Sequence, residues 1–308
     1  MPPLPDSRTE PDGSAVIRVL TYNIRSMRDD RAALARVIRA CAPDLVFVQE
    51  APRFFRWRKY ASWLARATDL VVLGGGATAA GPLLLCSLRA TVESTRDVLL
   101  PRTPGLHRRG FATAVVRFGR ARLGVLSCHL SLNAGERLDQ AGKVLDGLKS
   151  MDAPHSVAAG DINEQPTGRA FRLLADQLQD GWATAPWGTE HTHGATSPDR
   201  RIDAVFATPG VEVLTCGVPA GLDGLSPRDL RRASAPFRLP RLPGGAVSSA
   251  ASPRRTVRPS EGGGFRAWRA LGVGQLCQQA RGARLGRVGG GAGAVSVACP
   301  GGRRRIPG

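Results

Sequence analysis

Polar side chains suited to catalysis follow short apolar runs at several points of this sequence. The clearest case is VAAGDINEQPTG, residues 157–168, in which Asp161 and Asn163 come directly after a small apolar run. Side chains two positions apart on an extended segment share a face, so this carboxylate and this amide are predicted to enter one cleft. Such a pair could polarise a water molecule beside a phosphate oxygen. An Asx-type turn is the structural alternative for the four letters GDIN.

Residues of similar chemistry lie at the ends of other apolar runs. Asn23 ends AVIRVLTYN, Glu50 ends DLVFVQE, His129 lies in ARLGVLSCHLSL, and Asp203 precedes the apolar part of RIDAVFAT. An isolated carboxylate is costly to desolvate, so Glu50 is either solvated at a strand tip or held by a cation. His129 by itself has an ordinary explanation as a hydrogen-bonded core residue. A site therefore requires that the fold bring these segments together.

Strand and helix patterns alternate along residues 15–233, which predicts an α/β plan. DDRAALARVIRAC (29–41) has its apolar residues on one helical face, and a strand pattern lies on each side of it. Further strands are predicted at GPLLLCSL (81–88), FATAVVRF (111–118), ARLGVLSCHLSL (121–132), HSVAAGD (155–161), RIDAVFAT (201–208) and VEVLTCGV (211–218). Further helices are predicted at GERLDQAGKVLDGLK (135–149) and RAFRLLADQL (169–178).

Charge and composition change abruptly at Ser234. The net charge of the chain is +18, and residues 234–308 contain 13 Arg against one Glu, with 16 Gly and no Lys or Asp. This composition is too poor in large apolar residues for a packed core, so we predict an Arg/Gly/Pro-rich disordered tail. The tail is either a genuine basic arm or GC-rich DNA translated in a shifted reading frame. The Pro-rich residues 1–14 are also predicted to be disordered.

Cysteine spacing and hydropathy restrict the class of protein further. The six cysteines are scattered without a C-x-x-C pair, which argues against a zinc knuckle or a redox dithiol and for reduced, buried thiols. The sequence starts without a signal-peptide pattern, and no apolar run is long enough to cross a membrane. We therefore expect a cytoplasmic protein without a membrane span; its oligomeric state is not readable from the sequence.

In their order along the chain, five segments resemble the endonuclease/exonuclease/phosphatase superfamily, whose fold is deoxyribonuclease I-like. They are TYNI (21–24), QE (49–50), SCHLSL (127–132), GDIN (160–163) and RIDAVF (201–206). The resemblance implies an α/β (α+β) four-layer sandwich of two mixed β-sheets flanked by helices, over residues 15–233. It also implies a metal-dependent phosphodiester hydrolase, with nucleic acid as the leading substrate and phospholipids or sugar phosphates behind it.

The same resemblance implies roles for the polar residues. Glu50 would hold a divalent metal, Mg²⁺ or Mn²⁺, with Asn23 beside it. His129 would hydrogen-bond the scissile phosphate. Asp161 would polarise the attacking water, and Asn163 would fix that water or a phosphate oxygen. The segment ERLDQ (136–140) is also similar to the helix start that many bacterial members show after HLSL.

The sequence departs from the family pattern near its last strand. The family has Ser-Asp-His-x-Pro there, whereas the corresponding region reads SPRDLRRASAPFRLPRLPGG (226–245), and no histidine follows His193. The resemblance assigns Asp203 to orient that missing histidine. We therefore expect the last strand to be lost and hydrolysis to be slow, because a positioned general acid or base contributes about 10²–10⁴ in rate. A catalytically inactive relative that binds nucleic acid through basic surfaces is the alternative function.

The segment RFFRWRKY (53–60), which follows Glu50 closely, interleaves cations with aromatic side chains. Side chains of these two kinds can stack on bases and contact phosphates, so the segment could hold nucleic acid. The alternative is an ordinary amphipathic helix whose aromatic residues face the core.

Overall fold

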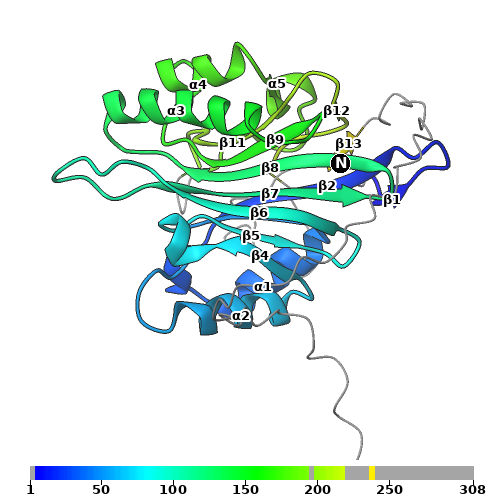
Figure 1. Ribbon diagram of the computed structural model, residues 1–308, viewed down its shortest axis with the longest axis horizontal. Helices are drawn as coiled ribbons and strands as arrows, with labels where there is room; N and C mark the ends of the chain where they lie inside the picture. Colours follow the sequence, from blue (N-terminus) through cyan, green and yellow to red (C-terminus); the bar gives the residue numbers. More distant parts are fainter. Residues whose placement is uncertain (1–3, 194–197, 219–235, 240–308) are drawn as a thin grey trace, which may run out of the picture. The chain divides into compact units, whose positions relative to one another are not determined.

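The computed structural model describes residues 4–193, 198–218 and, for the backbone, 236–239 (Figure 1). Its strands are β1 (Arg8–Thr9), β2 (Ala15–Asn23), β3 (Leu45–Gln49), β4 (Val71–Gly75), β5 (Leu83–Cys86), β6 (Thr91–Leu99), β7 (Gly110–Phe118), β8 (Ala121–His129), β9 (Ser156–Asp161), β10 (Gln179–Asp180), β11 (Asp203–Ala207), β12 (Glu212–Val213) and β13 (Pro236–Leu239). Its helices are α1 (Arg31–Cys41), α2 (Trp57–Ala67), α3 (Ala134–Lys149), α4 (Arg169–Ala175) and α5 (Gly181–Thr184), with 3₁₀ turns at Arg25–Met27 and Gly76–Ala79.

The strands form two mixed sheets. The order in the first is β12-β13-β2-β3-β5-β4, with β1 also paired to β2, and the order in the second is β10-β11-β9-β8-β7-β6. The pairs β2–β3 and β8–β9 are parallel, and the remaining pairs are antiparallel. Figure 1 shows the sheets packed face to face, with α1 and α2 outside the first and α3 and α4 outside the second. The predicted four-layer sandwich is confirmed.

Alternation along the strands explains these layers. Odd-numbered residues of β8 and β9, such as Val125 and Val157, point between the sheets into a shared apolar cluster. Even-numbered residues of the same strands, such as Leu126 and Ala158, pack instead with α3 and α4. The first sheet buries its other face against α1 and α2 in the same way. β8 and β9 therefore each contribute to two layers of core.

The helices begin where the sequence offers capping side chains. The Asp30 carboxylate accepts hydrogen bonds from the amides of Ala32 and Ala33 at the start of α1, and the Asn133 side chain accepts one from Glu136 at the start of α3. The helices predicted over residues 29–41, 135–149 and 169–178 are all present in these regions, although α4 is shorter than predicted.

The predicted loss of the last strand is wrong for the backbone. β13 lies between β12 and β2, antiparallel to both, with Phe237 opposite Ile17. β3 and β1 pair along one edge of β2, and β13 pairs along the other, where the buried backbone groups of β2 need partners. β13 is only four residues long and begins with proline, so alternation in the sequence did not reveal it. The strand lies beyond the boundary that we predicted at Ser234.

Part of the N-terminal segment that we expected to be disordered is also ordered. Arg8 and Thr9 form β1, and the Arg18 guanidinium donates hydrogen bonds to the carbonyl oxygens of Leu4 and Pro5. The predicted disorder and shifted frame of residues 240–308 lie outside the described residues.

The cysteine prediction is confirmed for the described part of the chain, where Cys41, Cys86, Cys128 and Cys216 are buried free thiols. Burial raises the pKa of Cys128 to about 12, so this thiol stays protonated near neutral pH. Among the described helices, none combines the length and apolar character needed to cross a membrane.

Candidate active site

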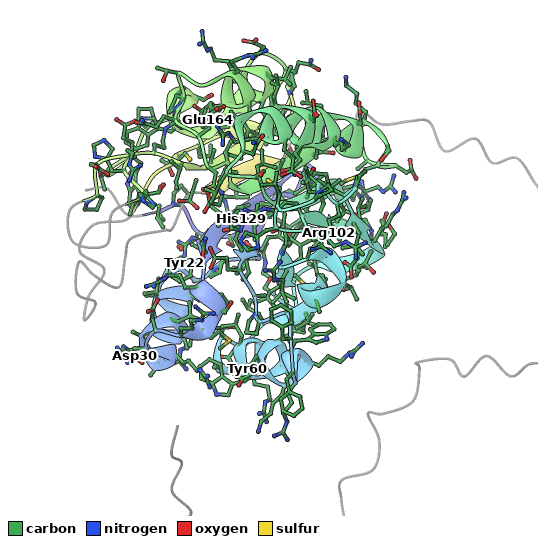
Figure 2. All side chains as sticks on the ribbon, turned by 90° about the vertical axis from the view of Figure 1, so that its left-hand side faces the viewer. Tyr22, Asp30, Tyr60, Arg102, His129 and Glu164 are labelled. Atoms are coloured by element: carbon green, nitrogen blue, oxygen red, sulfur yellow. The ribbon has the colours of Figure 1, made fainter. Side chains whose placement is uncertain are left out.

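Four strand ends bring predicted site residues together at one rim. Asn23 ends β2, Glu50 follows β3, His129 ends β8 and Asp161 ends β9. The Asn23 amide nitrogen donates hydrogen bonds to Glu50 Oε1 at 2.9 Å and to Asp161 Oδ2 at 3.1 Å. His129 Nε2 lies 3.7 Å from the same Asp161 Oδ2. Figure 2 is drawn from the side on which β8 ends and labels His129 together with Tyr22, the neighbour of Asn23.

Strand register places three of the predicted residues in one row. Parallel pairing of β8 and β9 puts His129 opposite Asp161, and antiparallel pairing of β9 and β11 puts Asp203 opposite Asp161. Directly opposite residues share a face of the sheet, and here it is the inward face that also carries Val125 and Val157. The three residues are at most 8% exposed. The three site residues therefore lie at the end of the apolar layer between the two sheets.

The glycine of GDIN allows β8 and β9 to approach closely at this row. A Cβ atom on Gly160 would lie 2.0 Å from the carbonyl oxygen of Cys128, which is closer than atoms can pack. Any larger residue at this position would push apart the strands that hold His129 and Asp161. The glycine is thus required by the approach of the two strands.

Asn163 reaches the site by a different route from the one predicted. Its φ of 55° is left-handed, so it does not continue the extended strand. Its amide N–H donates to Asp161 Oδ1 at 3.0 Å, as in an Asx-type turn, and its side-chain nitrogen donates to the carbonyl oxygen of Leu130 at 2.8 Å. Strand alternation is therefore the wrong reason for its position. The Asx-type turn, which was the alternative interpretation of GDIN, is present. This turn holds Asn163 beside Asp161.

Glu50 also has a left-handed backbone, with φ of 53°. This conformation costs of order 1–3 kcal/mol for a residue other than glycine, and such residues cluster at functional sites. The backbone of Glu50 is held by a hydrogen bond from the Ser26 amide to its carbonyl oxygen at 2.8 Å. The side chain is half-buried and points to Asn23. Glu50 therefore offers the more accessible carboxylate of the site.

A polar layer that the sequence analysis missed lies beneath the site. Thr21 and Gln49 are one pleat below the rim, and their side chains exchange hydrogen bonds at 3.3 and 3.1 Å. Ser127, two residues before His129, donates to the carbonyl oxygen of Val48. All three are at most 2% exposed. These three polar residues lie between the apolar core and the charged rim. Their burial is tolerated because each side chain has a hydrogen-bond partner within the protein.

Arg109 is a second feature that the sequence analysis missed. It directly precedes β7, and its Nε atom is buried with no hydrogen-bond partner among the described residues. Burial lowers the pKa of Arg109, while the nearby carboxylates of Asp161 and Glu50 act to raise it. A half-buried cation next to two carboxylates can balance their charge or contact an anionic ligand. The only signal for Arg109 in the sequence was that a cation directly precedes an apolar strand pattern.

The loops after β8 and β9 are held by the segment ERLDQ. Arg137 donates to Glu164 Oε1 at 2.8 and 3.1 Å and to the carbonyl oxygens of Ser131 and Leu132, both at 3.0 Å. Gln140 accepts a hydrogen bond from the Ser131 amide at 2.8 Å. These contacts tie α3 to the loops next to His129 and Asn163, so the resemblance noted for this segment corresponds to a structural role.

Glu164 connects that brace to α4. Its second oxygen accepts hydrogen bonds from the amides of Ala170 and Phe171, in the first turn of α4. Burial acts to raise the pKa of Glu164, but the hydrogen bonds from Arg137 and from these amides outweigh it and lower the pKa. Glu164 is therefore a carboxylate that the folded chain holds in its charged form.

A buried ion pair holds the segment that leads into β11. Arg201 makes two hydrogen bonds to the Asp180 carboxylate, at 2.7 and 2.8 Å, and its guanidinium lies 5.0 Å from the Phe171 ring centroid. Thr192 Oγ1 accepts a hydrogen bond from the amide of Asp203 at 3.1 Å. These contacts fix the start of the strand that carries Asp203.

His191 and His193 lie in the segment before β11 and have contacts of their own there. The backbone of His193 pairs with Arg200, and His191 lies 3.7 Å from Glu190, with both side chains of that pair exposed. The segment that would carry the missing Ser-Asp-His signature, residues 219–235, lies outside the described residues.

The donor set at the rim fits a magnesium or manganese ion. Among the described residues, no group of three or more His, Cys, Asp or Glu side chains is arranged so that it could hold a metal ion by itself. Mg²⁺ does not need such a cluster, because it is usually held by one or two carboxylates together with waters and substrate phosphates. Glu50 and the neighbouring Asn23 supply a carboxylate and an amide in hydrogen-bond contact. The oxygen chemistry of this pair suits a hard divalent cation.

A groove of about 590 Å³ lies elsewhere, between β6 and α3. It is on the outer face of the second sheet, whereas His129, Asp161 and Asp203 face inward. Its lining mixes cations such as Arg96 and Lys143 with acids such as Asp146. It is therefore separate from the rim site.

Comparison with known proteins agrees with this geometry. The model of the endonuclease/exonuclease/phosphatase family matches residues 20–252. The chain belongs to the endonuclease/exonuclease/phosphatase family. The matched range includes every site residue discussed above and extends past β13.

Solved structures show the same endonuclease/exonuclease/phosphatase fold. A family protein from Bacteroides vulgatus is 19% identical, with a TM-score of 0.58 over 73% of this chain and 97% of its own. A mannosyl-6-phosphatase from Bacteroides thetaiotaomicron is 18% identical, with a TM-score of 0.57 over 73% of this chain and 98% of its own. TDP2 from D. rerio, in complex with a single-strand DNA product, is 19% identical, with a TM-score of 0.54 over 72% of this chain and 98% of its own. No curated protein matches the chain at a significant level.

Proposed function

We propose that this chain is a metal-dependent phosphodiester hydrolase that uses Mg²⁺ or Mn²⁺, with nucleic acid as its leading substrate. The observation that carries the proposal is the convergence of Asn23, Glu50, His129 and Asp161 from four strands, linked by the contacts of the Asn23 amide and by His129 beside Asp161. Membership of a family of phosphoester hydrolases supports it.

Asp161 is placed to act on the attacking water. Its two oxygens are held by different donors, Asn23 at one and the Asn163 amide at the other, so the orientation of the carboxylate is defined before substrate binds. Such a carboxylate can accept the proton of a water molecule as that water attacks phosphorus. Preorganisation of this kind avoids the cost of reorienting dipoles during the reaction.

Cationic and hydrogen-bonding groups on the other side of Asp161 suit the phosphate. His129 can donate a hydrogen bond from its ring to a non-bridging phosphate oxygen, and the half-buried Arg109 adds positive charge. Glu50 and Asn23 would hold the metal, which when bound supplies Lewis-acid stabilisation to the phosphate oxygens. Asp203, in the row with Asp161, would keep its proposed role of orienting and charge-stabilising an imidazole.

A hydrolysis assay with purified full-length chain tests the proposal. Plasmid DNA and a small chromogenic phosphodiester are incubated with Mg²⁺ or Mn²⁺, with a chelator, and with the Asp161→Asn variant. We expect slow, metal-dependent hydrolysis that falls by about 10²–10⁴ in the variant. Equal activity of the two proteins would place the chemistry elsewhere and refute the proposal.

A second function is favoured by one observation, the absence of the Ser-Asp-His signature from the sequence. On that basis the chain would be a catalytically inactive relative that binds nucleic acid through basic surfaces. The same assay separates the two functions, because this alternative predicts nucleic-acid binding without metal-dependent hydrolysis.

A further inference from the structure

Two adjacent phenylalanines project into solvent next to the candidate site. Phe54 is 81% exposed and Phe55 is 85% exposed, in the loop between Glu50 and α2. We call this pair the Phe platform. Exposed aromatic rings do not gain the stabilisation that burial normally gives them. An adjacent exposed pair is therefore typical of a surface that binds a ligand or a partner.

The aromatic residues of α2, by contrast, are partly buried against the rest of the protein. Tyr60 and Trp63 pack against the cluster beneath α1 and α2, and the Trp57 ring lies against Gly76, where a Cβ atom would approach it to 2.8 Å. The amphipathic-helix interpretation of this segment therefore holds from Trp57 onward. It does not account for the Phe platform, which precedes the helix.

The surroundings of the Phe platform are strongly cationic. Residues 51–68 contain five Arg or Lys and no acidic residue. The Arg53 guanidinium lies 5.8 Å from the Phe54 ring centroid, and that of Arg56 lies 5.7 Å from the Phe55 centroid. Arg56, Arg58 and Lys59 are exposed. A ligand with flat rings and negative charge complements such a surface.

Arg53 connects the Phe platform to the candidate site. Its guanidinium donates a hydrogen bond to the carbonyl oxygen of Ala80 at 3.1 Å, and it is close enough to Arg109 to lower the pKa of that residue. Arg109 in turn interacts with Asp161 and Glu50. Phe54 is four residues from Glu50, a separation of at most about 14 Å along the chain.

A second basic segment borders the same side. The turn between β6 and β7 contains Arg102 and Arg108, both exposed, in addition to Arg109. Figure 1 shows this turn extending beyond the rest of the second sheet, and Figure 2 labels Arg102 in it and Tyr60 on α2.

We propose that Phe54 and Phe55 stack on bases of single-stranded nucleic acid, while the neighbouring cations contact its phosphates and position a phosphodiester at Asp161. This inference rests on the proposed function of the site. Bases in a duplex already stack on each other, so a platform of this kind favours unpaired bases. Stacking on an aromatic side chain tolerates any base, so little sequence preference is expected.

Binding in the absence of metal tests the Phe platform separately from hydrolysis. Full-length chain in chelator is titrated into a fluorescent 12-nucleotide thymidine oligonucleotide and into an abasic strand of the same length, and anisotropy is measured. The abasic strand has the same phosphates, so it reports the purely electrostatic binding to which every Arg of the chain contributes. We expect the thymidine strand to bind at least about tenfold more tightly than the abasic strand.

Two variants identify the residues responsible. The double substitution Phe54→Leu with Phe55→Leu keeps apolar side chains of similar volume and removes the rings, so it should lose the preference for the thymidine strand. Leu88→Ala is the matched control, because Leu88 is also 85% exposed and follows β5, whose last residue pairs with the start of β3, away from the site. This control should retain the preference.

Three results would overturn the proposal: equal binding of the thymidine and abasic strands by wild type, retention of the preference in the double variant, or its loss in the Leu88→Ala control. Sedimentation with anionic phosphatidylserine vesicles adds one more. If wild type did not prefer thymidine and bound vesicles more tightly than a Phe54→Ser, Phe55→Ser variant, the Phe platform would be a membrane-contacting surface instead. Absence of hydrolysis by wild type with metal would refute the proposed function while leaving the binding result intact.

Discussion

The two sheets contribute very different halves to the candidate site. The second sheet supplies His129, Asp161 and Asp203 from adjacent strands in register, and all three are at most 8% exposed. The first sheet supplies Asn23 from the end of β2 and Glu50 from a left-handed residue beyond the end of β3, half-buried at the rim. We call the second-sheet residues the embedded half and the first-sheet residues the open half. Asn23 is itself only 6% exposed, so the opening to ligands lies at Glu50 and the loop that follows it.

This contrast indicates how the site divides its work. The second-sheet residues are braced through Arg137 and Glu164 and by the buried pair of Arg201 and Asp180, which suits groups that must keep one orientation. The half from the first sheet carries a carboxylate in a strained backbone conformation next to the exposed Phe platform, which suits the capture of a cation and of substrate. Substitutions in one half are therefore expected to leave the chemistry of the other half unchanged.

The largest effect is expected from His129→Gln, in the embedded half. Loss of the imidazole should lower the rate of phosphodiester hydrolysis by about 10²–10³, as when one preorganised donor to a transition state is removed. Metal affinity, measured by calorimetry, should stay within about twofold, because the proposed metal ligands are Glu50 and Asn23 and not His129. A parallel loss of metal affinity would show that the two halves are not separable.

The next effect concerns the brace behind the embedded half. Arg137→Met would leave Glu164 Oε1 and two loop carbonyl oxygens without the donor that Arg137 supplies, so we expect a loss of about 3–5 kcal/mol in the free energy of unfolding in urea. Arg36→Met is the control, because Arg36 and Asp30 form an exposed pair 3.9 Å apart, and it should cost at most about 1 kcal/mol. Similar losses in the two variants would contradict the proposed brace.

Glu50→Gln tests the open half. Removal of the charged ligand should weaken Mg²⁺ or Mn²⁺ binding by at least about tenfold, read from calorimetry or from the metal-induced rise in Tm. The Tm without metal should change little, since Glu50 is half-buried at the rim. An unchanged metal response would mean that the ion, if bound, lies at another site.

The smallest effect is the pH dependence of Glu164. Its pKa in the folded chain is lowered from an ordinary value of 4.5, so its stabilising contribution is complete above that pH and is lost as pH falls through the folded pKa. Glu164→Gln should therefore cost about 1–2 kcal/mol at pH 7, and the difference from wild type should shrink as the pH is lowered below 4.5. Urea unfolding at several pH values measures this. A constant difference across that range would contradict a charge-dependent role for Glu164.

The embedded half was predictable from sequence because strand alternation continues into it. Val125, Ser127 and His129 are successive inward positions of β8, so a polar residue at the end of an apolar run already indicated a rim. The order of the five motifs then predicted the fold and grouped the site residues. Arg109 was not predictable in this way, since its proximity to Asp161 depends on how the turn before β7 returns to the sheet.

Other misses have local causes. Asn163 was expected on an extended segment, but a carboxylate two residues earlier captured its amide and turned the chain. β13 was missed because its stability comes from pairing with the edge of β2. The paired residues of β2 are distant in sequence, so no local pattern indicates the strand. In RFFRWRKY, residues 53–56 and residues 57–60 have similar compositions. The start of α2 at Trp57 decides which aromatic rings pack against the protein and which remain exposed.

The pairing of β13 with β2 also affects how the chain is made. Residues 15–18 leave the ribosome early, while their partners at 236–239 follow more than 200 residues later. At a synthesis rate of about 5–20 residues per second, one edge of β2 waits roughly 10–45 s for its partner strand. During that interval the nascent chain exposes a strand edge that could pair with other chains, so we expect its yield in cells to depend on chaperones and on the speed of translation.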